Sequence, residues 1–276
     1  MEAFCQSVEK YRPQRAHLVP PIIIQLGKSP IVDKYDLSSL SMIVSAAAPL
    51  STETEQAVLD RIGCEVKQAW GMSELSPIGT FTSDYNIRSG SVGQLVPSTF
   101  GKVVDPSTQL SLGPGETGEL MIKGPQVMMG YLNDANKTAE CLSEDGWLKT
   151  GDVAKYDEDG FFYITDRLKE LIKVRGYQVA PAEIEALLLT HPNISDSAVI
   201  PVEDEASGEL PRAYVTLKGD EVSQTVTEED IKSWVKERVA PFKRLEGGVC
   251  FIDQVPKSSS GKILRRLLVE EARKEK

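Results

Sequence analysis

The sequence predicts an α/β fold, in which part of a large domain with a β-subdomain is followed by a small, mobile α/β domain. Short apolar runs typical of buried strands alternate with helical patterns in the first part. Gly and Pro recur at short intervals over residues 90–166, as they do in small β-structures. A strand–helix–strand order then begins near residue 166. We therefore expect two domains, 1–166 and 167–276, with the β-subdomain at about 90–166.

Helices and buried strands alternate over the first 70 residues. Two apolar residues spaced by four predict a helix over 1–12. A second helix is predicted over 51–62, with Ser51 or Thr52 as its N-cap and glutamates in its first turn. Apolar runs predict strands at 19–24, 41–45 and 65–70.

The remaining elements are predicted from turn clusters and helix caps. Pro181 suits the first turn of a helix over 181–191, where a missing N–H costs nothing. Thr227, with Asp230 three residues later, predicts the start of a helix over 227–239. Arg175 and Gly176 are read as a hairpin turn. Strands are predicted at 118–123, 160–165, 170–174, 198–202, 213–218 and 249–252, and a basic terminal helix at 263–275.

Charge and composition exclude several classes of function. The formal charge of −10 argues against general nucleic-acid binding, because phosphate backbones repel an acidic chain. The longest apolar stretch, residues 18–26, is too short to span a bilayer. Scattered cysteines without a CxxC pair give no zinc site and suit a reducing, cytoplasmic setting: Cys5, Cys64, Cys141 and Cys250. The C-terminus is not the Ser-Lys-Leu signal of peroxisomal proteins. Neither His17 nor His191 lies in a catalytic context for a Ser-His-Asp hydrolase.

Three motifs contain residues suited to chemistry on an anionic substrate. They are Gln-Ala-Trp-Gly-Met-Ser-Glu at 68–74, Thr-Gly-Asp at 150–152 followed by the segment 166–178, and Pro-Lys-Ser-Ser-Ser-Gly-Lys at 256–262. The last is not a Walker A loop, because Pro256 stands where the first glycine belongs. Taken singly, each motif also has a plain structural interpretation. Trp70 could be a core residue, Asp152 a turn cap and Lys262 a solvated loop lysine.

In this order and at these separations, the three motifs resemble those of the adenylate-forming superfamily. It includes acyl-CoA synthetases, 4-coumarate–CoA ligases, beetle luciferases and the adenylation domains of peptide synthetases. The resemblance implies a reaction in two steps. A carboxylate attacks ATP to give acyl-AMP and pyrophosphate, and a thiol, usually that of CoA, then displaces AMP. It also implies ATP, Mg²⁺, CoA and a small carboxylic acid as cofactors and partners of a monomer or homodimer.

The resemblance assigns the nucleotide to the first two motifs. Asp152 would accept both ribose hydroxyls, and Arg167 would reach the ribose and phosphate. Trp70 would stack on adenine where relatives usually have Tyr. Ser73 would contact the α-phosphate, and Glu74 would help to hold Mg²⁺. Further residues would line the adenylate: Ala47, Gln68 and Ala69.

The remaining motif residues would serve catalysis and the thiol. Lys262 resembles the adenylation lysine, whose charge bridges the carboxylate and the α-phosphate as negative charge builds between them. Lys169 falls at the hinge position, about which the small domain would swing. Lys173 and Gln178 resemble residues of thioester formation. Two residues would line the CoA tunnel, Arg175 and Gly176.

The acyl pocket gives a partial indication of the acid. Gly71 stands where acetate-activating relatives have a Trp that caps the pocket, so an open pocket and a longer or aromatic acid are expected. Ala46 and Ala69 stand where coumarate ligases carry Gly, and Val44 stands where they carry Lys, which makes the slot narrower and more apolar. A medium-chain fatty acid therefore fits as well as an aromatic one.

The phosphate loop of the superfamily is expected upstream of residue 1, together with about half of the large domain. Residues 1–166 would then expose faces that are otherwise covered, whereas 169–276 could fold alone. Three functions remain open. They are an acid–CoA ligase, a luciferase-like or carrier-loading adenylating enzyme, and a truncated, non-catalytic remnant.

Overall fold

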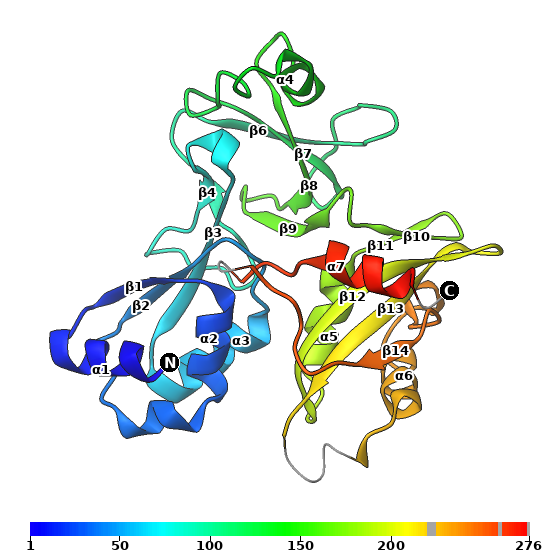
Figure 1. Cartoon of the computed structure of the whole chain (residues 1–276). Helices are drawn as coiled ribbons and strands as arrows, with labels where there is room; N and C mark the ends of the chain where they lie inside the picture. The colour runs from blue at the N-terminus through cyan, green and yellow to red at the C-terminus, as the bar shows by residue number, and fades with distance from the viewer. Residues whose placement is uncertain (220–224, 259–260, 275–276) are drawn as a thin grey trace. The chain divides into compact units, whose positions relative to one another are not determined.

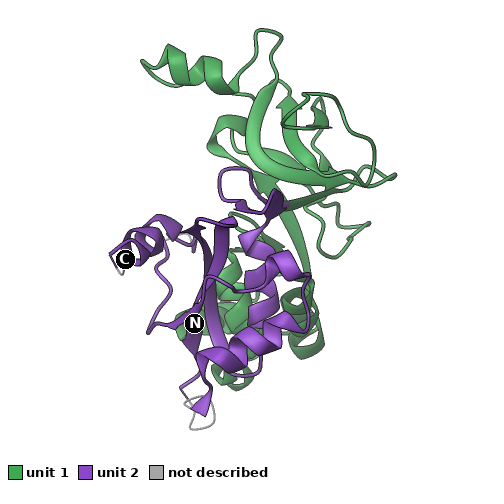
Figure 2. Ribbon diagram, turned by 90° about the vertical axis from the view of Figure 1, so that its right-hand side faces the viewer, with its two compact units in different colours: residues 1–164 green, residues 165–276 purple. Residues whose placement is uncertain are grey.

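The computed structural model describes residues 1–219, 225–258 and 261–274 (Figure 1). Contacts divide the chain into two compact units, Met1–Ile164 (unit 1) and Thr165–Lys276 (unit 2), which Figure 2 shows in two colours. Within the described residues, no helix has the length and apolar character needed to cross a bilayer. The mixed helices and sheets agree with the predicted α/β class.

Unit 1 contains a five-stranded sheet with the strand order β1-β2-β3-β4-β5. The first three strands run parallel, with Leu18 opposite Ser45 and Ser45 opposite Gln68, and the last two are antiparallel. The strands are β1 (Arg15–Leu18), β2 (Met42–Ser45), β3 (Glu65–Gly71), β4 (Ile78–Phe81) and β5 (Gln94–Leu95). The predicted strands at 41–45 and 65–70 are therefore confirmed, while β1 was not predicted.

Three helices pack beside these strands and share one apolar core, which includes Val8, Ile23, Ile43 and Val58. They are α1 (Glu2–Tyr11), α2 (Pro20–Lys28) and α3 (Thr52–Ile62), with the 3-10 turn η1 (Pro30–Lys34) after α2. The helices predicted over 1–12 and 51–62 are confirmed. The Ser51 side chain caps α3 by accepting from the Thr54 N–H at 3.3 Å.

The strand predicted at 19–24 is wrong, because this segment begins helix α2. Pro20 and Pro21 occupy the first turn, where neither missing N–H removes a helical hydrogen bond. Extended Val19 precedes them as the N-cap. The buried residues Pro20, Ile23 and Leu26 recur every three positions, which is a helical period. The short apolar run at 19–24 fits either a strand or a helix when it is read alone. The residues that follow it, Gln25–Lys28, form the last turn of α2.

The second sheet has the order β6-β7-β8-β9, with β6 and β8 antiparallel to β7, and it belongs to unit 1 except for the last three residues of β9. Its strands are β6 (Phe100–Val104), β7 (Gly118–Lys123), β8 (Leu148–Tyr156) and β9 (Phe162–Arg167). The strand predicted at 118–123 is confirmed. The one predicted at 160–165 begins two residues later, because the Asp157–Gly160 turn, closed by the Gly160 N–H to Asp157 O bond, precedes it. Helix α4 (Ala135–Cys141) was not predicted.

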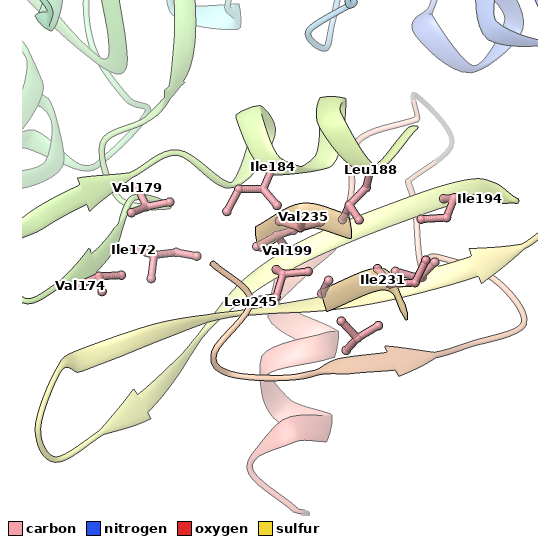
Figure 3. Packing of buried hydrophobic residues seen from close by; sticks show 13 residues of the cluster. Ile172, Val174, Val179, Ile184, Leu188, Ile194, Val199, Ile231, Val235 and Leu245 are labelled. Carbon is pink, nitrogen blue, oxygen red and sulfur yellow. The ribbon is translucent and has the colours of Figure 1, made fainter. Parts of the chain in front are cut away.

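Unit 2 is a small α/β unit whose sheet has the order β11-β10-β13-β12, with β14 beside β13. Figure 3 shows its core, where Ile184 and Leu188 of α5 face the sheet together with Ile231 and Val235 of α6. The strands are β10 (Ile172–Val174), β11 (Tyr177–Val179), β12 (Ile194–Asp204), β13 (Gly208–Leu217) and β14 (Val249–Phe251). The helices are α5 (Pro181–Leu189), α6 (Glu228–Lys236) and α7 (Arg265–Ala272), with the 3-10 turn η4 (Pro241–Lys243).

Every element predicted for this unit is present, with shifted ends. Thr227 and Asp230 form a reciprocal capping box at the start of α6, as the sequence predicts. The strand predicted from Glu170 starts only at Ile172, because the Glu170 N–H closes a turn onto Arg167 O at 2.9 Å. The terminal helix spans Arg265–Ala272, and the predicted residue 275 lies outside the described part of the chain.

Candidate functional site

The parallel strands of unit 1 place two predicted segments at one edge of the sheet. Because β1, β2 and β3 run in the same direction, the residues that follow β2 and β3 emerge at their common carboxyl edge. These residues are Ala46 and Ala47 after β2, and Met72, Ser73 and Glu74 after β3. Ala47 has a left-handed backbone with φ of 79°, which is uncommon for a non-glycine residue. Ala46, Ala47 and Ser73 are exposed at this edge.

Trp70 and Asp152 meet although they lie 82 residues apart in the sequence. The Trp70 Nε1–H donates to Asp152 Oδ2 at 2.8 Å, and the two residues are only 9% and 6% exposed. Thr150 fixes the Asp152 backbone, because its hydroxyl accepts from the Asp152 N–H at 3.1 Å and donates to Leu120 O at 2.7 Å. Two residues predicted to hold adenosine are thus brought together in one unit, and the edge of the indole is engaged by the carboxylate.

Glu74 has a hydrogen-bond partner that the sequence analysis missed. The Tyr131 hydroxyl donates to Glu74 Oε1 at 2.7 Å, and the Met128 N–H donates to the Glu74 backbone carbonyl at 2.8 Å. The hydrogen bond to this carboxylate raises the pKa of Tyr131 to about 12. Protein-bound Mg²⁺ needs only one or two carboxylates when phosphates supply other ligands. With Oε1 committed to Tyr131, Glu74 Oε2 fits that requirement as a single protein ligand.

The Gln68 side chain is used inside the unit. Its Nε2 donates to Leu50 O at 3.0 Å and to Glu55 Oε1 at 2.8 Å, and Gln68 is 5% exposed. Glu55 also accepts from the Ser89 hydroxyl and the Gly90 N–H, and burial raises its pKa. The amide of Gln68 therefore joins β3 to α3, and Glu55 in turn joins α3 to the segment at 89–90. Ala69 beside it is buried at 7% exposure, so any contact of this pair with a nucleotide involves mainly the backbone.

Gly71 is required by the close approach of a neighbouring backbone. A Cβ at this position would lie 1.9 Å from Pro77 O and 2.9 Å from the Ile78 Cα. Gly79 is similarly constrained, because its Cβ would lie 2.5 Å from Cζ3 of the Trp70 ring. The absence of a side chain at Gly71 therefore has a steric reason within the fold, separate from the predicted open pocket.

The predicted thioester residues of unit 2 face each other across a hairpin. Lys173 on β10 is the register partner of Gln178 on β11, and both are exposed. Arg175 and Gly176 form the two-residue turn, with φ of 50° and 86°. Two such residues in a row are the backbone pattern of a type I′ turn. The Arg175 side chain is anchored, because its Nε donates to Ser207 Oγ at 3.0 Å.

The predicted hinge lies in the turn between β9 and β10. Lys169 and Arg167 are exposed there, while Asp166 beside them is buried at 6% exposure. Asp166 Oδ2 accepts from the Ala182 N–H at 2.9 Å, in the first turn of α5. One side of the predicted hinge is therefore bonded to the start of this helix.

Lys262 is exposed at the end of a short hairpin. Lys257 forms an antiparallel bridge with Ile263, and the Ser258 N–H donates to Lys262 O at 2.9 Å. The Lys262 N–H in turn donates to Ser258 Oγ at 3.1 Å. Ser259 and Ser260 of this motif lie outside the described residues. The predicted catalytic lysine thus lies between the two residues that form the β-bridge.

Comparison with known proteins identifies the family. Residues 1–132 match the family model of AMP-binding enzymes, and residues 183–262 match that of the AMP-binding enzyme C-terminal domain. The chain belongs to the adenylate-forming AMP-binding enzymes. Both family models thus match the chain, one in each predicted domain.

Similar adenylate-forming enzymes include ligases and a luciferase. The chain is 45% identical to "Probable 4-coumarate--CoA ligase 1" of Dictyostelium discoideum over 267 residues, which are 96% of this chain and 48% of that protein. It is 46% identical to "Luciferin 4-monooxygenase" of Photuris pensylvanica over 266 residues, again 96% of this chain and 48% of that protein. The chain therefore spans about half the length of the curated relatives that it matches.

Solved structures of the family share the fold. ATP-bound MatB from Rhodopseudomonas palustris superimposes with a TM-score of 0.88 at 29% identity, covering 98% of this chain and 52% of that one. The anthranilate CoA ligase AuaEII, in complex with anthranoyl-AMP, gives 0.88 at 27% identity, with the same coverage of both chains. These likenesses support the use of ATP by the family fold.

No pattern in the sequence points directly to the residues that hold the motifs in place. Glu55 and Tyr131 carry no motif of their own, and they contact motif residues 13 and 57 positions away. Glu55 had one signal, since a glutamate at this position of an amphipathic helix faces the core and needs a polar partner. For Tyr131 and Gly79 the sequence contains no signal that would have pointed to them.

Proposed function

We propose that this chain is the C-terminal half of an ATP-dependent acid–CoA ligase. In the first step, a carboxylate oxygen bonds to the α-phosphorus of ATP, and the bond to the leaving pyrophosphate breaks. In the second step, the CoA thiol gives up its proton, its sulfur bonds to the acyl carbon, and AMP leaves with the electrons of the broken C–O bond. Residues 1–166 would belong to the large AMP-binding domain, and 167–276 would form the lid that moves about Lys169.

The contact between Trp70 and Asp152 carries this proposal. A buried carboxylate held by an indole N–H at 2.8 Å is fixed in orientation, as recognition of two ribose hydroxyls requires. The indole beside it offers a π-face for adenine. Ser73 would contact the α-phosphate, and Arg167 would reach the ribose and phosphate. Glu74 Oε2 would hold Mg²⁺, which would neutralise phosphate charge when bound.

The residues of unit 2 would act on the reacting groups. Lys262 would bridge the carboxylate and α-phosphate, where its charge favours the transition state of acyl-AMP formation. Lys173 and Gln178, opposite each other on the hairpin, would serve thioester formation. The exposed turn of Arg175 and Gly176 would line the CoA path.

For the acid, we propose an aromatic or medium-chain carboxylic acid. The exposed Ala46 at the carboxyl edge of β2 would line the acyl pocket, together with Gly71. The resemblance to enzymes named for 4-coumarate and anthranilate supports an aromatic acid. We further propose that the enzyme is cytoplasmic, that it is a monomer or homodimer, and that its partners are small molecules.

Product analysis tests this proposal. The chain is incubated with ATP, Mg²⁺, CoA and a pool of cinnamic, benzoic and fatty acids, and acyl-AMP and acyl-CoA are detected by mass spectrometry. Because the phosphate loop is expected upstream of residue 1, we expect both products only when the upstream half is supplied, and we expect Lys262→Ala to abolish them. Lys274→Ala is the matched control, because Lys274 is also exposed and lies outside the motif. Neither product from the folded chain alone would mean that the upstream half is needed, whereas neither product with the upstream half supplied would contradict the proposal.

A luciferase-like adenylating enzyme is the second candidate, favoured by the 46% identity to the Photuris protein. The same assay separates the two functions. Acyl-AMP that accumulates without acyl-CoA in the presence of excess CoA would support this candidate over a CoA ligase.

A further inference from the structure

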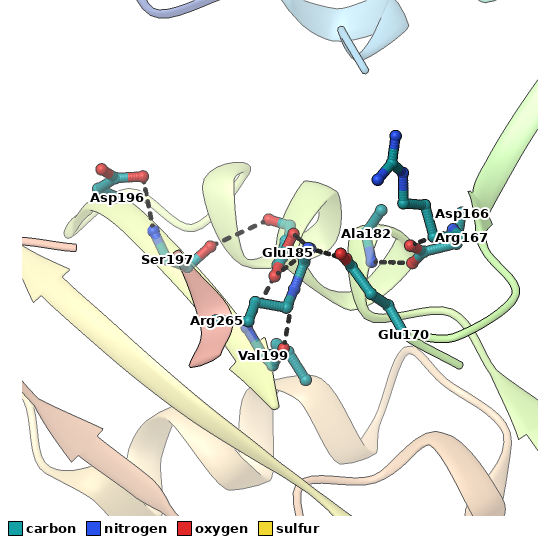
Figure 4. Close-up of polar contacts among 9 residues, drawn as sticks. All are labelled: Asp166, Arg167, Glu170, Ala182, Glu185, Asp196, Ser197, Val199 and Arg265. Atoms are coloured by element: carbon teal, nitrogen blue, oxygen red, sulfur yellow. Dashed lines mark hydrogen bonds and ion pairs between the residues drawn. The ribbon is translucent and has the colours of Figure 1, made fainter. Parts of the chain in front are cut away.

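The Lys262 hairpin is flanked by ion pairs that no motif accounts for. On one side, Lys257 Nζ contacts Asp196 Oδ2 of β12 at 2.6 Å. On the other side, Arg265 begins α7 three residues after Lys262. Figure 4 shows Arg265 in the middle of a polar cluster between α5, β12 and the turn that holds Glu170.

Arg265 contacts three elements at once. Its Nη2 donates to both carboxylate oxygens of Glu185 on α5, at 2.9 and 2.8 Å, and its Nη1 pairs with Glu170. Its Nε donates to the Val199 carbonyl of β12 at 3.3 Å. Val199 completes the cluster, because its N–H donates to Glu185 Oε1 at 2.8 Å. Only a guanidinium has enough donors in a fixed fork to make all these contacts.

The cluster is too buried to be an ordinary surface ion pair. The side chains of Arg265 and Glu185 are 18% and 9% exposed, and that of Glu170 is 34% exposed. Exposed ion pairs contribute little to structure, whereas a buried pair constrains the groups that it joins, because separating them leaves a charge without a partner. The neighbouring Arg266 is exposed and makes no ion pair with any residue that the structure describes.

We propose that Arg265 is a positioning residue for Lys262. Its contacts with Glu185 of α5 and with Glu170 of the hinge turn fix the position of the Lys262 hairpin relative to these two segments. Glu170 directly follows Lys169, so one guanidinium connects the hinge turn to the hairpin of the adenylation lysine. The hairpin is then fixed from both sides, by the ion pair of Lys257 with Asp196 of β12 and by that of Arg265 with Glu185 of α5. This inference rests on the proposed function of Lys262, because the hairpin needs a fixed position only if that amine acts on a substrate.

Hydrogen exchange measured by mass spectrometry tests the positioning without any turnover. The reporter amides are those of Ser258, Lys262 and Leu264, whose N–H groups are bonded within the hairpin or to Pro256 O. Arg265→Met should raise their exchange rates at least tenfold, because the hairpin opens locally once its anchor is lost. Arg266→Met is the matched control and should change them less than twofold.

Further variants separate local positioning from general unfolding. Arg265→Lys keeps the charge without the fork and should protect the hairpin only in part. The double variant Arg265→Met with Glu185→Gln leaves no lone buried charge at Glu185, so it should keep the β12 and β13 amides protected while the hairpin amides still exchange fast. The effects of the two single substitutions should be non-additive, since the side chains act as a pair.

The ratio of the effects on kcat and on KM for ATP is a further readout, because a general loss of stability does not change kcat selectively. Arg265→Met should lower kcat for acyl-AMP formation at least tenfold and leave KM for ATP within twofold, because Lys262 would act mainly in the transition state. Unchanged hairpin exchange in a folded Arg265→Met variant would overturn the inference, as would an equal rise in Arg266→Met. Absence of product from the unsubstituted chain supplied with the upstream half would count against the proposed function, and the exchange results would still decide the position of the hairpin.

Discussion

Replacing Gly71 with alanine tests whether this glycine serves the fold or the acyl pocket. Its Cβ would lie 1.9 Å from Pro77 O, whereas ordinary van der Waals contacts begin near 3.4 Å. The backbones of β3 and of the Pro77–Ile78 segment would have to separate by more than 1 Å, and neither can rotate away as a side chain would. We expect Gly71→Ala to lower the free energy of unfolding of unit 1 by about 3 kcal/mol, the upper part of the range for overpacking.

Urea unfolding followed by tryptophan fluorescence measures this change. Trp234→Phe is introduced as a common background, so that the signal comes only from Trp70 and Trp147 in unit 1. Gly113→Ala is the matched control, because its Cβ would meet only the end of the Glu116 side chain, at 3.4 Å. It should change the stability by less than about 1 kcal/mol. Equal midpoints for the two variants would refute the steric argument and favour the open acyl pocket as the reason for Gly71.

Three other substitutions test single contacts. Trp70→Phe removes the N–H that donates to buried Asp152 and should weaken ATP binding at least tenfold in calorimetric titration. Trp147→Phe is the control and should leave the affinity for ATP unchanged. Equal affinities of the two variants would exclude a role of the Trp70 indole in nucleotide binding. Gly176→Ala should cost unit 2 about 1 kcal/mol in urea unfolding, because alanine is strained at a φ of 86°, and Gly176→Asn should cost less. Burial raises the pKa of Glu185, while the Arg265 guanidinium paired with it opposes that rise. Glu185→Gln removes the charge that Arg265 faces and should lower the urea midpoint of unit 2, because a buried guanidinium is then left without this partner; an unchanged midpoint would contradict the pairing.

Local signals in the sequence were sufficient where a short segment decides its own structure. The capping box of Thr227 and Asp230 is complete within four residues, so the start of α6 could be predicted from chemistry alone. The Arg175–Gly176 turn is equally local. The strand predicted at 19–24 was wrong because the apolar run there fits a strand or a helix equally well. Only the contacts of Ile23 and Leu26 with the rest of the core select the helix.

In the candidate site, too, local features could be predicted from the sequence and long-range contacts could not. Motif residues such as Ser73, Lys173 and Lys262 are exposed, and their chemistry can be recognised from residue type and spacing. Nothing in the sequence indicates that Trp70 and Asp152 share a hydrogen bond, because 82 residues and two different sheets separate them. Long-range contacts of this kind depend on tertiary packing, which no local pattern encodes.

Partners that hold a motif residue differ physically from the motif residues themselves. Glu55 and Glu185 are carboxylates at 6% and 7% exposure, on faces of helices where apolar residues are expected. A charge in such a place is costly unless it is paired, and here each carboxylate meets a side chain of a functional segment, Gln68 for one and Arg265 for the other. Buried carboxylates on otherwise apolar helix faces therefore indicate which parts of this chain must be held in position, and they can be found from the helical period before any contact is known. By this criterion the segments at 68–74 and 257–265 require fixed geometry, and both contain residues that we assign to acyl-AMP formation.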